Sequence, residues 1–119
     1  KSKATKYKQR IINIWNEVAP FYHNRWAKNE IGPFSVTNSL IKSARIKSGY
    51  TVLDLACGTG LVTKKILTRV GRGQVYGVDS SKSALDIARK WVGKKQNMHF
   101  ILGDAETIQF DTKFDIITC

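Results

Sequence analysis

The feature that most constrains the fold is residues 51–60, TVLDLACGTG, where an apolar segment runs directly into a glycine turn. Apolar residues bounded by Gly-Thr-Gly are typical of a buried parallel strand that leads into a helix. Asp54 lies inside this strand, where burial of a carboxylate is costly unless it is hydrogen-bonded, and this favours a functional role. Gly58 and Gly60 carry no Cβ, so the backbone there can approach a ligand closely. The stretch predicts a nucleotide-like cofactor site.

The composition is that of a globular protein, with 42% hydrophobic and 10% aromatic residues in a chain of 119. This length predicts one domain with a small core. No apolar run of about 18 residues occurs, and the basic start KSKATKYKQR has no apolar signal-peptide region, so we expect a cytoplasmic protein without membrane contact. The two cysteines, Cys57 and Cys119, form neither a disulfide framework nor a CxxC pattern, and no metal site is expected.

The chain is strongly basic, with 20 Lys and Arg against 9 Asp and Glu and a formal net charge of +11. Such a charge favours contact with nucleic acid or anionic surfaces. However, the charges fall on helix faces and at the N-terminus, without the aromatic interleaving of a single-strand binder. Nucleic acid is therefore the less favoured partner, although the charge leaves it open.

The first part of the chain has a helical pattern. Residues 1–10 carry five positive charges and no apolar stripe, so we expect a frayed or solvated arm there. From Ile11 onwards apolar residues recur every three or four positions, which predicts a helix that ends or kinks at Ala19, before Pro20. The aromatic-rich residues 20–34 predict a loop or a broken helix, either as a lid over a ligand or as packing against the sheet edge.

A second helix is expected after Pro33, on an apolar stripe formed by Val36, Leu40, Ile41 and Ala44. A basic last turn and a glycine stop would end this helix at Lys47, Ser48 and Gly49. Residues 1–50 are thus predicted to be an N-terminal helical lid or arm.

Residues 51–119 alternate predicted strands and helices and are interpreted as a cofactor-binding βαβ core. The strands are expected at 51–56, 74–79, 98–105 and 113–119, and the helices at 61–70 and 82–92. This alternation predicts an α/β fold with a Rossmann-like, doubly wound parallel sheet. The last strand should be covered on both faces and lead into another helix, so we expect a sheet that is incomplete after four strands. Its exposed edge could pair with another chain.

Acidic residues end the second and third predicted strands. In open α/β sheets the ligand lies beyond the carboxyl ends of the strands, where the strand order reverses. Asp79 follows Gly60 by 19 residues, about where a ribose-binding carboxylate is expected, although an acid before Ser80 could also serve only the helix N-terminus. Asp104 ends the third strand. A dinucleotide fingerprint would need a third glycine where this chain has Thr63, which disfavours a nicotinamide cofactor.

The pattern DLACGTG, followed by VDSS, GDAETIQF and FDIITC, resembles the motifs of class I S-adenosylmethionine-dependent methyltransferases. WNEVAPFYH is similar to the FDxxAxxYD signature of the ubiquinone and menaquinone C-methyltransferase branch, with Asn16 and His23 in place of two Asp residues. The resemblance covers residues 15–119 and implies S-adenosylmethionine as the cofactor and a small-molecule methyl acceptor.

The resemblance also implies how the methionine portion of the cofactor would be held. Asp54 would orient the glycine loop and the cofactor amino group, and the backbone at Ala56, Cys57 and Gly58 would face the methionine portion. Tyr22 would cover the methionine carboxylate, which favours the lid interpretation. The floor, where the fourth strand ends, would be lined by Thr118 and Cys119.

The nucleoside portion is assigned by the same resemblance. Asp79 would hold the ribose diol, and Ser80 would lie beside the adenine ring. Asp104 would accept a hydrogen bond from the adenine amino group, with a backbone donor from Ala105 nearby.

No catalytic residue is assigned, because displacement at a sulfonium methyl group needs orientation and desolvation more than a protein nucleophile. His23 could act as a general base, but packing explains it more simply, and His99 is interpreted as structural. Tight packing also explains Cys57 better than nucleophilic chemistry does. The leading interpretation is a methyltransferase that acts on a small molecule. The alternatives are an inactive cofactor-binding fragment, a nicotinamide-dependent oxidoreductase and an RNA methyltransferase.

Overall fold

The computed structural model describes residues 3–119, and its centre is one sheet of four parallel strands. The strand order is β3-β2-β1-β4, formed by β1 (Thr51–Leu55), β2 (Gln74–Asp79), β3 (Met98–Leu102) and β4 (Ile116–Thr118). The chain moves outward from β1 to β3 and returns past β1 to β4, so the strand order reverses at β1. The predicted Rossmann-like α/β sheet is therefore confirmed.

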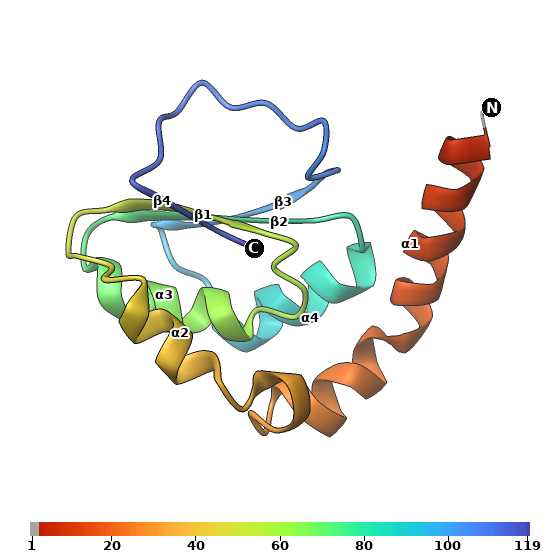
Figure 1. Ribbon diagram of the computed structural model, residues 1–119, viewed down its shortest axis with the longest axis horizontal. Coiled ribbons are helices and arrows are strands. Elements are labelled where there is room, and N and C mark those ends of the chain that lie inside the picture. Colours follow the sequence, from red (N-terminus) through yellow and green to blue (C-terminus); the bar gives the residue numbers. More distant parts are fainter. Residues whose placement is uncertain (1–2) are drawn as a thin grey trace.

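Two helices cover one face of this sheet. Right-handed crossovers in the same direction place α3 (Leu61–Val70) and α4 (Lys82–Val92) on the same side, below the sheet in Figure 1. The bounds of α3 agree with the prediction from the sequence. The other face is covered by the connection 103–115, in which Phe110 and Phe114 pack edge-to-face on Tyr76 of β2, with ring centroids 5.9 and 5.6 Å away.

His99 of β3 has a structural role, as the sequence predicted. Its ring stacks on Tyr76 with centroids 4.6 Å apart, and its Nε2 lies 2.8 Å from Oε1 of Gln74. The third strand ends at Leu102, so Asp104 lies in the turn beyond it rather than at its last residue. β4 lies at the other edge of the sheet, where Ile117 is 60% exposed. Pairing of this edge with another chain stays a prediction.

The N-terminal segment contains α1 (Lys3–Tyr22), a π-helix η1 (His23–Ala27), a short 3-10 helix η2 (Gly32–Phe34) and α2 (Thr37–Ser43). The predicted fraying of residues 1–10 is wrong for residues 3–10, which form the first turns of α1, although all of them except the half-buried Lys8 are exposed to solvent as expected. Residues 1–2 lie outside the described part of the chain. These turns are held because Nζ of Lys8 lies 2.9 Å from carboxylate oxygens of both Asp104 and Glu106.

The prediction that the first helix could end at Ala19 is wrong, because α1 continues through Pro20 to Tyr22 and passes directly into η1. Ala19 is only 2% exposed, and its burial holds the helix where a proline removes one backbone donor. The broken-helix interpretation of residues 20–34 is confirmed by the π turn and the 3-10 turn that follow.

The second helix is shorter than predicted. α2 ends at Ser43, because Arg45 takes a left-handed conformation with φ of 52°, and Gly49, with φ of 90°, then turns the chain towards β1. The predicted apolar stripe is only partly buried: Ile41 is 4% exposed, whereas Val36 and Leu40 are 55% and 62% exposed.

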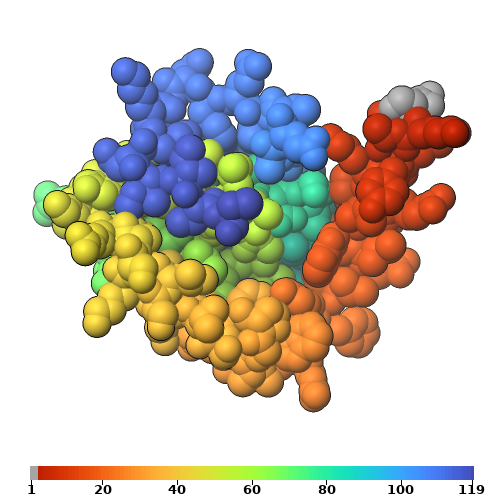
Figure 2. Space-filling view, viewed as in Figure 1, coloured from red at the N-terminus to blue at the C-terminus, as the bar shows by residue number. Residues whose placement is uncertain are grey.

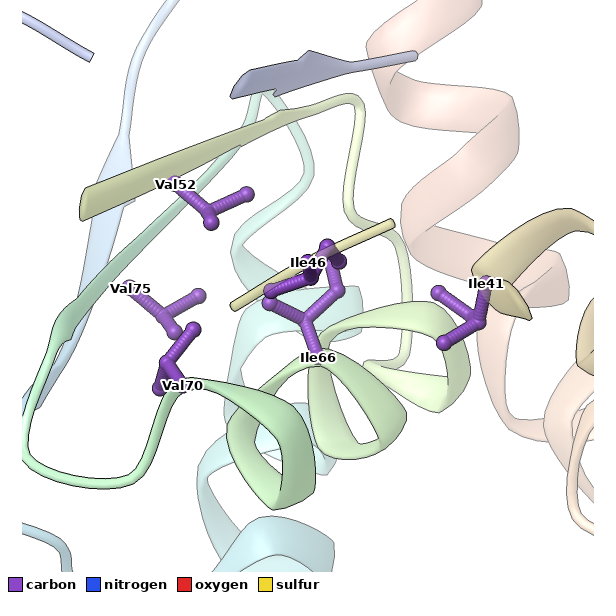
Figure 3. Close-up of a cluster of buried hydrophobic side chains, with 6 residues drawn as sticks. All are labelled: Ile41, Ile46, Val52, Ile66, Val70 and Val75. Carbon is purple, nitrogen blue, oxygen red and sulfur yellow. The ribbon is translucent and has the colours of Figure 1, made fainter. Parts of the chain in front are cut away.

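The hydrophobic core lies between the sheet and its helices. Figure 3 shows its centre, in which side chains from α2, the following loop, β1, α3 and β2 meet, namely Ile41, Ile46, Val52, Ile66, Val70 and Val75. This cluster draws on both sides of residue 50, so α2 and the loop after it share the core of the sheet, while α1 packs on α4. The division into units 1–50 and 51–119 stays a prediction. Within residues 3–119, the helices lack the length and apolar character needed to cross a membrane.

Candidate functional site

A cavity of about 660 Å³ lies where the strand order reverses, beyond the carboxyl ends of β1, β2 and β4. One wall is formed by the glycine loop 56–60, the start of α3, residues 79–81 and the end of β4. The other wall is formed by α1, η2 and α2. Figure 1 shows α1 beside this edge of the sheet, and in Figure 2 atoms from the middle of the chain (green) are visible between the N-terminal segment (red to gold) and the C-terminal residues (dark blue).

The glycine loop takes a left-handed conformation at three positions, with φ of 55° at Ala56, 56° at Gly58 and 97° at Gly60. The two glycines serve different purposes. A Cβ at Gly58 would meet no atom within 4 Å, so the backbone is open towards the cavity, whereas a Cβ at Gly60 would lie 3.1 Å from Cβ of Ala88 in α4. The backbone N–H of Cys57 donates to the carbonyl of Val78 at 2.9 Å and joins the loop to β2.

Asp54 is buried at the end of β1, where it is 3% exposed. Its two carboxylate oxygens accept hydrogen bonds from the hydroxyl of Thr63 in α3 at 2.7 Å and from the hydroxyl of Thr118 in β4 at 2.9 Å. Burial, with a smaller contribution from the charge of Asp79, raises the pKa of Asp54 to about 6 against the action of the two hydroxyls. Asp54 therefore ties β1 to α3 and to β4 at the base of the glycine loop.

Asp79 is aimed at the same loop from the end of β2. One carboxylate oxygen accepts from the backbone N–H of Gly58 at 2.8 Å, and the other accepts from the N–H of Ser81 at 2.9 Å. Each oxygen of a carboxylate has two lone pairs, so each can accept one further hydrogen bond from a ligand. Ser81 rather than Ser80 caps α4, through its hydroxyl oxygen 3.2 Å from the N–H of Ala84, and Ser80 lines the cavity.

The opposite wall is aromatic. Tyr22 lines the cavity and contacts Trp15, Trp26 and Phe34 edge-to-face, with all three centroid distances at 5.4 Å. Burial raises the pKa of the Tyr22 hydroxyl. Trp15, Tyr22 and Phe34 line the cavity, and the lid interpretation of the segment stays a prediction. The predicted contact of Tyr22 with a carboxylate stays a prediction.

Two residues that depart from the FDxxAxxYD signature make specific contacts that sequence reasoning missed. Oδ1 of Asn16 accepts from the hydroxyl of Ser81 at 2.7 Å and from the N–H of Ser83 at 3.1 Å, which fixes α1 on the start of α4. Nδ1 of His23 lies 2.9 Å from the hydroxyl oxygen of Thr59 in the glycine loop. Their position within the signature was the only sign in the sequence that Asn16 and His23 matter. The neighbouring residues do not indicate that their partners are Ser81, Ser83 and Thr59.

Asp104 and Ala105 do not line the cavity. The carboxylate of Asp104 accepts from the backbone N–H of Glu106 and pairs with Lys8 of α1, both at 2.9 Å, and these two groups hold its pKa below the usual range. Their contact with adenine stays a prediction. At the other end of the cavity, Thr118 and Cys119 form part of the lining, as expected.

Cys57 lies in the cavity lining, and the residue is 8% exposed. Burial, followed by the nearby charges of Asp54 and Asp79, raises the pKa of this thiol strongly. The protonated thiol is a poor nucleophile, in agreement with a packing role. Among residues 3–119, the structure contains no group of three or more His, Cys, Asp or Glu side chains placed to hold a metal ion.

The chain matches the methyltransferase domain family over residues 52–119. The matched residues make up more than half of the chain, and the protein therefore belongs to that family. The resemblance to class I S-adenosylmethionine-dependent methyltransferases is thereby confirmed, and the family assignment speaks against the nicotinamide-dependent oxidoreductase.

Individual relatives extend beyond this match. A 2-phytyl-1,4-naphtoquinone methyltransferase of Nostoc punctiforme is 33% identical over 116 residues, which cover 91% of this chain and 50% of the relative. A demethylmenaquinone methyltransferase of Staphylococcus saprophyticus is 32% identical over 98 residues, which cover 81% of this chain and 38% of the relative. The chain spans between 26% and 57% of the length of the first curated relatives that it matches.

A solved structure shares both the fold and part of the sequence. The crystal structure of an S-adenosylmethionine-dependent methyltransferase from Thiobacillus denitrificans in complex with S-adenosyl-L-homocysteine has a TM-score of 0.61 and 27% identity. The similarity covers 75% of this chain and 36% of that one.

Proposed function

We propose that this chain binds S-adenosylmethionine in the cavity and forms the cofactor-binding part of a methyltransferase that acts on an uncharged small molecule. The observation that carries the proposal is the contact between Asp79 and the backbone N–H of Gly58. This contact places the Asp79 carboxylate, which has free lone pairs, beside the backbone of Gly58, where a ligand has open space. Both residues lie where the strand order of the sheet reverses.

The residues present fit the parts of this cofactor. The carboxylate of Asp79 can accept two hydroxyl groups of a ribose, and Ser80 lies next to it on the cavity wall. Gly58 leaves space where any other residue would place a side chain, which suits close approach of the methionine portion. Asp54 supports this arrangement from β1, because its carboxylate accepts hydrogen bonds from Thr63 and Thr118.

When bound, S-adenosylmethionine supplies an electrophilic sulfonium methyl group, which an electron pair of the acceptor attacks while the carbon-sulfur bond breaks to give a neutral thioether. The chain itself has to orient the two reactants and exclude water. The aromatic wall around Tyr22 suits both tasks, because its rings contact one another and leave few polar groups on that side of the cavity.

The character of this wall also supports the class of acceptor. Its contribution to the cavity is almost entirely apolar, from Ile11, Trp15, Ala19, Tyr22, Phe34, Thr37, Leu40, Ile41 and Ala44. Among the described residues that line the cavity, only Asp54 and Asp79 are charged. Asp54 is bonded to Thr63 and Thr118, and the free lone pairs of Asp79 are assigned to the ribose of the cofactor. A charged acceptor would therefore lose its hydration without gaining a partner, whereas an uncharged apolar acceptor would not. The quinone methyltransferases among the relatives support this choice.

The binding test is calorimetric titration of the chain with S-adenosylhomocysteine. We expect Asp79→Ala to weaken binding about a hundredfold, because it removes a charged acceptor from the ligand, and each such hydrogen bond contributes about 1.5–3 kcal/mol. Asp111→Ala is the matched control, since Asp111 is an exposed aspartate in the connection between β3 and β4. Equal affinities of Asp79→Ala and the unaltered chain would contradict the site, and tight binding of an oxidised nicotinamide dinucleotide instead would contradict the cofactor.

Methyl transfer is tested separately from binding, because the chain spans only part of its relatives. The comparison is between this chain and a longer product that includes it, each supplied with cofactor carrying an isotopically labelled methyl group. Transfer by the longer product but not by this chain would favour the inactive-fragment alternative. Binding without transfer by either protein would contradict the proposed activity, and transfer to RNA would contradict the small-molecule acceptor.

A further inference from the structure

We infer that His23 is a positioning residue that ties the N-terminal segment to the glycine loop through Thr59, and that its protonation releases the segment and weakens cofactor binding. The part of this inference that concerns the cofactor rests on the proposed function. The part that concerns the segment rests only on contacts within the chain.

The contact between His23 and Thr59 is buried on both sides. His23 is the first residue of η1 and is 7% exposed, and Thr59 is 5% exposed. Nδ1 of His23 lies 2.9 Å from Oγ1 of Thr59, which is placed between Gly58 and Gly60. A shift of Thr59 therefore moves the backbone N–H of Gly58, which donates to Asp79. In this way the conformation of the loop is coupled to the docking of η1.

The imidazole is also held from the side of α4. Its ring meets Trp91 edge-on with centroids 4.7 Å apart, and Nζ of Lys64 lies 4.6 Å from the centroid of the Trp91 ring. Tyr22, immediately before His23, belongs to the aromatic wall of the cavity. Docking of His23 thus places the residues that close the cavity.

The charges around this ring are unfavourable for an imidazolium ion. Lys28 at the end of η1 and Lys64 of α3 are cations, whereas the contacts from the glycine loop and from α4, Thr59 and Trp91, are uncharged. The carboxylate on the loop side is that of Asp79, which is bonded to Gly58 and Ser81. Burial, and then Lys28, lowers the pKa of His23 in the docked state. The docked segment therefore binds the proton less well than the released one, and docking is weakened progressively as the pH falls below the ordinary value of 6.5.

The chain offers a matched pair of variants because it contains two histidines. His23→Gln keeps a polar side chain that does not titrate, and His99→Gln changes the histidine on β3, remote from the cavity lining. Affinity for S-adenosylhomocysteine is measured at pH 8 and pH 5.5. Protonation of a released histidine with its ordinary pKa limits the loss to about tenfold, so we expect the unaltered chain and His99→Gln to lose up to about tenfold more affinity than His23→Gln. Asp54 also titrates in this range, but its contribution is common to all three proteins and cancels.

A second measurement needs no cofactor. Hydrogen exchange of the backbone amides of residues 11–27 is compared between variants at the same pH, which cancels the intrinsic pH dependence of exchange. At pH 5.5 we expect faster exchange in the unaltered chain than in His23→Gln, and at pH 8 faster exchange in Thr59→Val than in the unaltered chain. Identical exchange in His23→Gln and the unaltered chain at both pH values would overturn the inference. If exchange follows the expectation while none of the proteins binds S-adenosylhomocysteine, the proposed function fails and the role of His23 in docking stands.

Discussion

Replacement of Asp54 by asparagine tests whether the chain sacrifices stability to keep a buried carboxylate in its site. Asp54 is 3% exposed and bonded to the hydroxyls of Thr63 and Thr118. A hydroxyl can donate to the amide oxygen or accept from the amide nitrogen, so Asp54→Asn can keep both contacts. The substitution removes the negative charge while it preserves the size of the side chain.

The magnitude follows from the raised pKa. A folded-state pKa of about 6, against the ordinary value of 3.8, means that the folded chain holds this proton more tightly than the unfolded chain. The stabilising effect of the proton is complete below pH 3.8 and is lost as the pH rises through about 6, which corresponds to about 3 kcal/mol at pH 8. Between pH 5 and pH 8 the same linkage gives a loss of about 1 kcal/mol.

The assay is urea unfolding of both proteins at pH 5 and pH 8. We expect the free energy of unfolding of Asp54→Asn to rise relative to that of the unaltered chain by about 1 kcal/mol between the two pH values, because the variant has no carboxylate to ionise. All other titrating groups are common to both proteins and cancel, and Asp111→Asn gives the background for an exposed aspartate. A difference between Asp54→Asn and the unaltered chain that does not change with pH would refute the argument.

The remaining predictions concern the glycine loop and the core. Gly60→Ala should lower the free energy of unfolding by about 1–3 kcal/mol, because its Cβ would lie 3.1 Å from that of Ala88 at a φ of 97°, as measured by urea unfolding. Gly58→Ala, whose Cβ would enter open space, should cost less stability but weaken the binding of S-adenosylhomocysteine in a calorimetric titration, and equal effects of the two variants on stability would contradict the assigned roles. Leu85→Ala should cost about 2–5 kcal/mol in urea unfolding, since Leu85 is fully buried in α4, and a cost no larger than that of Leu102→Ala, at a position 55% exposed, would contradict the packing described.

The N-terminal segment shows where local patterns stop being informative. Its sequence favours an early helix end, because Pro20 lacks a donor, and a solvated arm, because residues 1–10 are basic. In the structure, the burial of Ala19 and the pairing of Lys8 with Asp104 extend the helix in both directions. Both contacts are tertiary, and a pattern of local propensity contains no information about them.

The sequence by itself determined the four strands, the helix Leu61–Val70 and the glycine loop, because apolar periodicity and glycine turns act over a few neighbouring residues. It also determined the family, through motifs that are each short and contiguous in the sequence. Only the tertiary structure decided that Asp54 is held by Thr118, 64 residues away, and that His23 reaches Thr59, 36 residues away. These pairs form because the strand order and the packing of α1 bring distant segments to one edge of the sheet. The residue types in each pair do not by themselves predict that contact.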